Sequence, residues 1–173
     1  MKGVFIKCLS DLIHEKYSKN QWEEILIKCG INSETNFIVT QDIKDIEALG
    51  IIEVAREVLK LSAEELAELF AQYWINVFAP TMYSIYFQKA RNAREFLLKM
   101  DEVHQRTTRN LPNAHPPRFE YKEIDKKTLI MKYKSYRGLM HFFVALVKAV
   151  GTYYKEELKV RQISGNKVEI IFS

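Results

Sequence analysis

The sequence is poor in the residues that would tie it to an oxidising compartment or a repetitive fold. It has only two cysteines, Cys8 and Cys29, which form no Cys-x-x-Cys pair, so neither a disulfide framework nor a cysteine zinc site is expected. Four prolines and six glycines in 173 residues exclude collagen-like and low-complexity chains. No apolar run approaches the roughly 20 residues of a membrane helix, and Lys7 interrupts the start before a signal sequence can form. These absences predict a cytoplasmic protein that does not insert into a membrane.

The residues that are present suit one folded domain over 1–173. Hydrophobic residues make up 47% of the chain and aromatic residues 12%, enough for a substantial core. There are 26 Lys and Arg against 22 Asp and Glu, a net charge of +4. Basic and acidic residues are interspersed along the chain rather than gathered in blocks, so a nucleic-acid partner is not predicted.

The first part of the chain shows the periodicity of helices. Apolar residues recur at helical spacing over 5–17, 20–29 and 43–59, with Asn20 as the expected cap of the second helix and Gly50 as a candidate kink in the third. These helices predict a helical N-terminal subdomain over 1–61, followed by the rest of the domain, 62–173.

The next segment predicts two further helices. Ser62 and Glu65 form a Ser-x-x-Glu capping box ahead of an apolar stripe that reaches Phe78, and Pro80 is expected to end this helix. A second helix is predicted over about 85–108.

The last third changes to strands. Strands are predicted at 118–124, 128–135, 158–163 and 167–172, with one helix between the two pairs at 139–150. The predicted fold is therefore α+β, with helices first and then helices packed on a C-terminal antiparallel sheet.

His104 is the first candidate for chemistry. On a helix its neighbours one and two turns back are Met100 and Leu97. The imidazole therefore projects from an apolar stripe and has no hydrogen-bond partner on its own helix. Such a histidine is either a core residue satisfied by a backbone carbonyl or a metal ligand. A neutral imidazole in an apolar pocket is also the usual axial ligand of a haem iron. The pattern alone does not choose between the two.

Tyr133, Ser135 and Arg137 are the second candidates. At a spacing of two, their side chains leave one face of an extended strand and offer two hydroxyls and a guanidinium to one acceptor. This set suits carboxylates, although a solvated strand face with an ion pair fits the same spacing. Together with His104 the row is a more specific signal, because a haem needs one axial base and donors for two propionates.

Other motifs are less specific. Pro116 and Pro117 ahead of a strand either stiffen its start or press on a flat ligand. The chain has no phosphate-binding glycine loop, no zinc-protease helix and no nucleophile elbow. The expectation is therefore that the protein is not an enzyme.

Four segments together resemble the haem nitric oxide/oxygen binding (H-NOX) family, which includes the haem domain of soluble guanylate cyclase. In chain order they are the opening 1–3, the segment 100–104 ending in His104, the segment 116–118, and the Tyr-x-Ser-x-Arg row 133–137. Their order and spacing match the family over essentially the whole chain.

The resemblance implies one non-covalent b-type haem between the helices and the sheet. His104 would be its proximal ligand, Tyr133, Ser135 and Arg137 would hold the propionates, and Pro117 would press on the porphyrin. The other pocket residues that the resemblance implies are Phe5, Trp74, Phe78, Phe142 and Leu146.

The resemblance also bears on the ligand. Oxygen-binding relatives carry a distal tyrosine where this chain has Phe142, and Leu9 offers no donor either. Trp74 has an indole N–H, but its place on an apolar stripe favours packing. The expectation is a sensor of NO, and also of CO, that discriminates against O₂. The alternatives are an oxygen sensor, a haem catalyst of peroxide or NO chemistry, and a protein-interaction module without haem.

Signalling is expected to follow from the iron–histidine bond. NO weakens the bond trans to it, so Fe–His104 would lengthen or break and the helices of 1–61 would shift against the rest. Relatives act beside histidine kinases, cyclic-di-nucleotide enzymes or chemotaxis receptors, and a bacterial sensor with such a partner is predicted.

Overall fold

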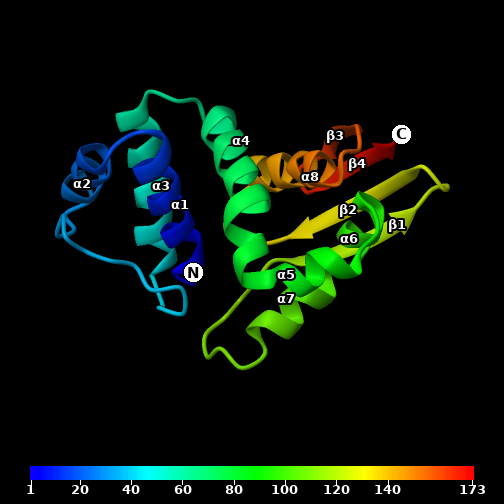
Figure 1. Cartoon of the computed structure of the whole chain (residues 1–173), viewed down its shortest axis with the longest axis horizontal. Helices are drawn as coiled ribbons and strands as arrows, with labels where there is room; N and C mark the ends of the chain where they lie inside the picture. Colours follow the sequence, from blue (N-terminus) through cyan, green and yellow to red (C-terminus); the bar gives the residue numbers. More distant parts are fainter. The chain divides into compact units, whose positions relative to one another are not determined.

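The computed structural model describes all residues, 1–173, and its elements are traced in Figure 1. The chain forms two compact units. The first comprises Met1–Leu66 and Leu111–Ala114, and the second comprises Ala67–Asn110 and His115–Ser173. None of the helices combines the length and apolar character needed to cross a bilayer.

The first unit is helical. It contains α1 (Val4–Lys16), α2 (Lys19–Lys28) and α3 (Asp45–Leu59), and α2 packs against both of the others. One face of each helix is buried, because its apolar residues recur at helical spacing. The fully buried side chains at the centre are Ile6, Leu9, Leu12, Ile13, Ile25, Leu26 and Ile51.

Two local expectations for this unit are wrong. The cap of α2 is Ser18, whose hydroxyl accepts a hydrogen bond from the backbone N–H of Gln21 at 3.2 Å, and Asn20 lies inside the helix. Helix α3 passes through Gly50 without a break. Its neighbour Ile51 is fully buried, and this packing outweighs the weak helix propensity of glycine.

Gly3 sits where no side chain fits. Its N–H donates to the Gln41 carbonyl at 2.8 Å, and an added Cβ would collide with the carbonyl oxygen of Ile38. Gly3→Ala is therefore expected to lower the free energy of unfolding by about 1–3 kcal/mol, as overpacking does. Thermal and urea unfolding measure this loss. The matched control is Gly50→Ala, which meets no atom within 4 Å and is expected to stabilise α3 by up to about 1 kcal/mol. Equal unfolding midpoints for the two variants would contradict the prediction.

Helix α4 (Ala63–Tyr73) begins with the expected capping box. The Ser62 hydroxyl accepts from the Glu65 N–H at 3.1 Å, and the Glu65 carboxylate accepts from the Ser62 N–H at 2.7 Å. Pro80, however, does not end the helix. A π-helical turn, η1 (Trp74–Phe78), leads directly into α5 (Ala79–Lys89), where Pro80 occupies the first turn. Proline lacks the N–H that would continue the regular hydrogen-bond ladder, and the π-helical turn directly before it carries the chain past this interruption.

The single helix expected over 85–108 is three helices. After α5 the chain is extended at Ala90, then forms α6 (Ala93–Leu98) and α7 (Met100–Thr108). The Asn92 side chain starts α6 by accepting the N–H of Glu95 at 2.8 Å. The apolar periodicity runs across this interruption, and the capping asparagine is the local signal that marks it.

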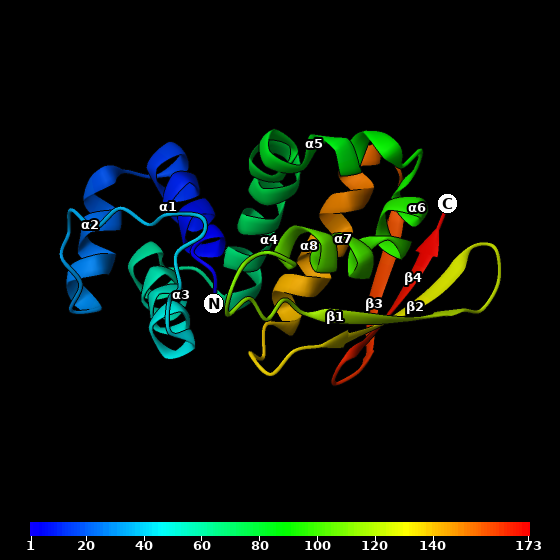
Figure 2. The ribbon, with the colours of Figure 1, turned by 90° about the horizontal axis from the view of Figure 1, so that it is seen from below.

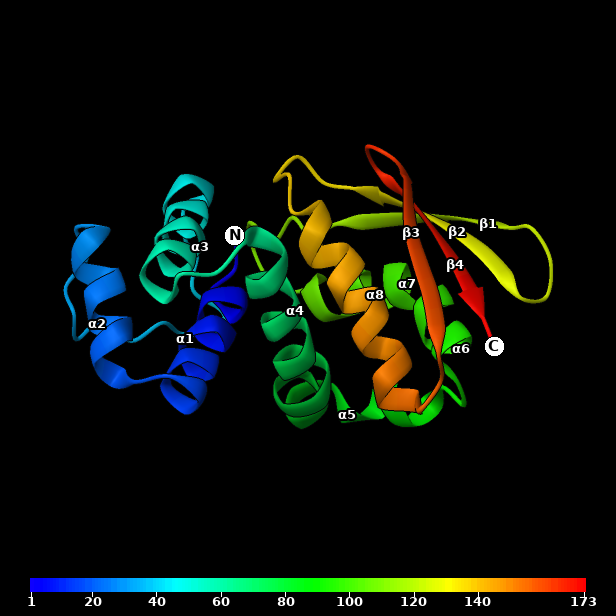
Figure 3. The same ribbon diagram turned by 90° about the horizontal axis from the view of Figure 1, so that it is seen from above.

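The C-terminal half confirms the antiparallel sheet and the α+β class. The strands are β1 (Arg118–Glu123), β2 (Thr128–Lys134), β3 (Leu158–Ser164) and β4 (Lys167–Phe172), in the order β1-β2-β4-β3, with α8 (Met140–Tyr154) between β2 and β3. Figures 2 and 3 show the helices of this unit on one face of the sheet, α8 against β3 and α7 against β1. Alternate strand residues are buried beneath these helices. Those at the centre are Leu129, Met131, Val168 and Ile170.

Candidate functional site

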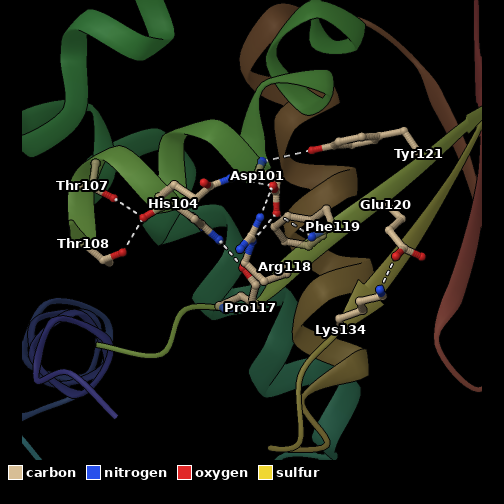
Figure 4. Close-up of polar contacts among 11 residues, drawn as sticks. Asp101, His104, Thr107, Thr108, Pro117, Arg118, Phe119, Glu120, Tyr121 and Lys134 are labelled. Atoms are coloured by element: carbon tan, nitrogen blue, oxygen red, sulfur yellow. Dashed lines mark hydrogen bonds and ion pairs between the residues drawn. The ribbon is translucent and has the colours of Figure 1, made fainter. Parts of the chain in front are cut away.

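His104 lies on α7, the helix that packs on β1. The Nδ1 atom of its ring is 3.1 Å from the backbone carbonyl oxygen of Pro117 (Figure 4). A carbonyl oxygen only accepts, so Nδ1 carries the proton and donates it. The Nε2 atom makes no hydrogen bond and is left with a free lone pair.

The surroundings of the ring keep it neutral. Burial lowers the pKa of His104, while the hydrogen bond to Pro117 and the charge of Asp101 raise it in part. Neutral imidazole is the form that ligates metals, and the ligating histidines of proteins typically donate their other N–H to a carbonyl or carboxylate. The geometry therefore leaves Nε2 as the nitrogen through which His104 could bind a metal.

Asp101, one turn before His104, clamps α7 to β1. Its carboxylate accepts two hydrogen bonds from the Arg118 guanidinium at 2.7 and 2.8 Å and one from the Phe119 N–H at 2.9 Å. The phenol oxygen of Tyr121 accepts the Asp101 N–H at 3.0 Å, so the start of α7 is tied to the strand twice (Figure 4). The hydrogen bonds from Arg118 hold the pKa of Asp101 well below its usual range. The aspartate is therefore ionised near neutral pH.

Asp101→Asn keeps the shape of this side chain and removes its charge. The paired hydrogen bonds to Arg118 would weaken, because a neutral amide presents one acceptor where the carboxylate presents two. We expect faster hydrogen exchange of the amides of 100–108, measured by mass spectrometry. The control is Glu102→Gln, whose carboxylate pairs only with Arg106 of the same helix. Unchanged exchange in Asp101→Asn, or equal acceleration in both variants, would show that this clamp does not hold α7.

Aromatic rings connect His104 to the sheet. The ring centroid of Phe119 lies 5.3 Å from that of His104, and Phe143 of α8 stacks on Phe119 at 5.4 Å. Tyr133 stacks on Phe143 with centroids 5.0 Å apart and planes at 11°. The structure thus brings Tyr133 and His104 to the same inner face of the sheet, joined through Phe119.

The row Tyr133, Ser135 and Arg137 is not one extended strand. Strand β2 ends at Lys134, and Ser135 and Arg137 lie in the loop that turns into α8. The Ser135 hydroxyl accepts the Arg137 N–H at 3.3 Å, and the chain adopts a positive φ at Gly138. The alternation fails here because the chain must turn to enter the helix.

The three polar groups nevertheless lie close together. Burial raises the pKa of Tyr133, and a hydrogen bond with the Ser135 side chain and the charge of Arg137 counteract this. The Arg137 guanidinium donates to the His115 carbonyl at 2.7 Å and to the Tyr136 hydroxyl at 3.0 Å. Two hydroxyls and a guanidinium thus lie near one another at the end of β2, and groups of this kind suit a carboxylate.

A second aromatic cluster joins η1 to α8. Trp74 stacks on Phe78 at 5.4 Å and on Phe70 at 5.6 Å, and Phe70 meets the ring of Phe142 edge to face at 5.3 Å. Leu146 follows Phe142 by one turn of α8 and is partly buried. The unit therefore brings Trp74 and Phe142 together through Phe70.

Phe5 is the one predicted pocket residue that belongs to the first unit, where it lies on α1 and is partly buried. Its contact with a ligand stays a prediction, as does that of the other predicted pocket residues.

Sequence analysis assigned no role to Asp101, Arg118, Phe119 or Phe70. Asp101 and Arg118 are 17 residues apart, and only the folded strand brings them together. Phe70 was a visible member of an apolar stripe, but its contact with Phe142 spans two distant helices. No periodicity in the sequence reports such contacts.

The arrangement suits a flat prosthetic group better than a bare ion. No three His, Cys, Asp or Glu side chains gather at one place in the way that the ligands of a bare metal ion do. A haem brings four nitrogens to its iron and needs one imidazole, apolar walls and donors for two carboxylates. The Nε2 atom of His104, the aromatic clusters and the donors around Tyr133 fit these needs.

Comparison with known proteins agrees with this chemistry. A family model described as haem-NO-binding matches residues 2–162. Soluble guanylate cyclase gcy-37 of Caenorhabditis elegans is 29% identical over 179 residues, which cover 96% of this chain and 25% of that protein. The chain thus spans about a quarter of the length of this curated relative.

Solved structures extend the likeness to the whole fold. The crystal structure of an oxygen-binding H-NOX domain related to soluble guanylate cyclases has a TM-score of 0.86 and 26% identity, and covers 100% of this chain and 95% of its own. A variant of the T. tengcongensis H-NOX also has a TM-score of 0.86 and 26% identity, with coverages of 100% and 98%. A variant of the Cs H-NOX has a TM-score of 0.90 and 26% identity, and the match covers 100% of this chain and 97% of that one. Because the family model covers nearly the whole chain, this protein belongs to the haem-NO-binding (H-NOX) family of haem-based gas-sensor domains.

Proposed function

We propose that this chain is a sensor of nitric oxide that holds one non-covalent b-type haem through His104. The observation that carries the proposal is the pair of ring nitrogens, with Nδ1 donating to the Pro117 carbonyl at 3.1 Å and Nε2 without a hydrogen bond. The bond to a carbonyl also suits a structural histidine, whereas a neutral ring with a free lone pair on its other nitrogen is what ligation of a haem iron requires.

The remaining residues take supporting roles. When bound, the haem would supply an iron that, in its ferrous form, binds a diatomic gas. Tyr133, Ser135 and Arg137 hold the propionates with their two hydroxyls and the guanidinium. Pro117, whose carbonyl accepts the hydrogen bond from His104, would press its ring on the macrocycle.

The aromatic cluster supports discrimination against oxygen. Bound oxygen carries partial negative charge and is retained by a hydrogen-bond donor, whereas NO and CO bind without one. Phe142, 2% exposed, presents only carbon and hydrogen, and its ring meets that of Phe70. We propose that NO and CO are the ligands for this reason.

Oxygen binding is the second candidate. The observation that favours it is Trp74, whose indole carries an N–H within the same cluster. One of the similar structures is also an oxygen-binding domain. Gas titrations of the loaded protein separate the two candidates.

The chain connects His104 to the N-terminal helices through a short loop. Residues 111–114, which follow α7, group with the first unit, where the Asn113 amide donates to the Asp42 carboxylate at 3.2 Å. Loss of the bond to His104 would free α7 to pull on this loop. We propose that the helices of 1–61 are the movable part that a partner senses. A histidine kinase, a cyclic-di-nucleotide enzyme, a chemotaxis receptor or a cyclase are the candidate partners.

Haem loading tests the first step of this proposal. The purified chain, titrated with haemin and reduced, is expected to saturate at one haem per chain, and acidified organic solvent should extract the group intact. A group that stays with the protein after extraction would contradict non-covalent attachment. A protein that never develops a haem absorption band would contradict the proposed function as a whole.

A further inference from the structure

The outer face of the sheet, which no helix of its unit covers, gathers positive charge (Figures 2 and 3). Strand alternation and register place six basic residues and two carboxylates there, apart from Arg118 at the start of β1, which pairs with Asp101 of α7. The basic residues are Lys122, Lys132, Lys134, Lys159, Arg161 and Lys167, and the carboxylates are Glu120 and Glu169. The excess of four equals the net charge of the whole chain, +4. Folding thus concentrates on this basic sheet face a charge that is dispersed along the sequence.

Some of this charge is paired. Glu120 accepts from Lys134 (Figure 4) and lies 3.3 Å from Lys132 Nζ. Glu169 pairs with Arg161 at 2.7 Å across β3 and β4. These pairs fix the two carboxylates within the face, so they do not repel an incoming anion as free carboxylates would.

Three lysines make no ion pair: Lys122 on β1, Lys159 on β3 and Lys167 on β4. Two isoleucines lie among them. Ile130 of β2 lies between Lys122 of β1 and Glu169 of β4. Ile171 of β4 lies opposite Lys159 of β3. Ile171 is 39% exposed. The basic sheet face therefore has an apolar centre with an unpaired ammonium group on either side.

We propose that the basic sheet face binds an acidic, amphipathic segment of a partner protein. Its carboxylates would meet the three unpaired lysines, and its small apolar side chains would cover Ile130 and Ile171. Charge complementarity favours such a partner and excludes basic ones. The face carries no aromatic side chain on which bases could stack, which disfavours single-stranded nucleic acid. This inference does not depend on the proposed gas chemistry.

A peptide that alternates glutamate and valine, labelled with a fluorophore, tests the proposal by fluorescence anisotropy with the full chain. We expect saturable binding that weakens as salt is added, because salt screens exposed charges. Joint replacement of Lys122, Lys159 and Lys167 by Gln is expected to weaken binding roughly tenfold.

Two controls define the site. In the first, Gln replaces three exposed lysines outside the sheet that also make no ion pair, namely Lys44, Lys89 and Lys99, and binding is expected to stay near that of the natural chain. In the second, Ile130→Thr and Ile171→Thr keep the charge and are expected to weaken binding through loss of apolar contact.

Three outcomes would overturn the proposal. They are absence of peptide binding, equal binding by the lysine variant and the natural chain, and binding of phosphatidylserine vesicles or a single-stranded oligonucleotide through these lysines with higher affinity than the peptide. Haem absorbance measured on the same samples reports separately on the proposed function.

Discussion

His104→Gly is expected to lose stoichiometric haem and to regain it when imidazole is supplied in the buffer. The substitution removes the only imidazole that the site offers through a free Nε2, and leaves a space that a small imidazole fills. We expect haem content below about a tenth of that of the natural chain without imidazole, since His104 would supply the only coordinate bond between the chain and the haem. Absorbance of the purified protein measures both states.

The matched control for this variant is His14→Gly. His14 also lies on a helix, α1, so both changes introduce glycine into a helix at a cost of about 1 kcal/mol. The control is expected to keep its haem. Loss of haem in both variants would assign the effect to stability, and retention of haem by His104→Gly without imidazole would contradict the role of His104.

The imidazole-loaded His104→Gly protein also separates ligation from signalling. Its iron would be held by a base that is not attached to α7, so α7 should behave as it does after loss of the natural bond. We expect hydrogen exchange over 100–108 and 1–61 to match that of the NO-treated natural chain, with no further change when NO is added. A normal exchange response to NO in this variant would rule out the proposed path from His104 to the N-terminal helices.

Phe142→Tyr is expected to raise oxygen affinity. The new hydroxyl would donate to a partly charged ligand, a bond of about 1.5–3 kcal/mol, which corresponds to roughly ten- to hundredfold slower oxygen loss. Because Phe142 is 2% exposed and packs on Phe70, the added atom should also cost about 1–3 kcal/mol of stability. Stopped-flow release of oxygen and thermal unfolding measure the two effects.

Phe143→Tyr makes the same chemical change one residue further along α8. Phe143 is also buried, at 5% exposure, but it stacks on Tyr133 and Phe119 against the sheet. This control is expected to lose stability without gaining oxygen affinity. A gain of equal size at both positions, or at neither, would contradict the placement of Phe142 beside the bound gas.

Local patterns predicted the elements well where packing and periodicity agree. The capping box of Ser62 and Glu65 and the hairpins of the sheet follow from short-range chemistry that the sequence displays directly. The errors fall where a local signal competes with its context. Pro80 was expected to end a helix but occupies the first turn of α5, and Asn92 interrupts an apolar stripe that continues beyond it.

The site shows the limit of such patterns more clearly. The apolar stripe around His104 left two interpretations open, a core histidine satisfied by a carbonyl and a metal ligand. The structure contains the hydrogen bond to a carbonyl that both interpretations allow. The carbonyl belongs to Pro117, 13 residues away, and the bond uses only Nδ1. Likewise, the lysines of the basic sheet face come from distant strands, so their common face emerges only with the register of the sheet.

The absorption spectrum of the anaerobically reduced protein, recorded before and after exposure first to air and then to NO, tests the central claim most directly. We expect a haem spectrum with His104 as the one axial ligand, little change during brief exposure to air, and conversion by NO to a spectrum without a bond to His104. A lasting oxygenated spectrum in air would contradict the discrimination against oxygen assigned to Phe142. An NO spectrum that keeps the bond to His104 would contradict the proposed signal.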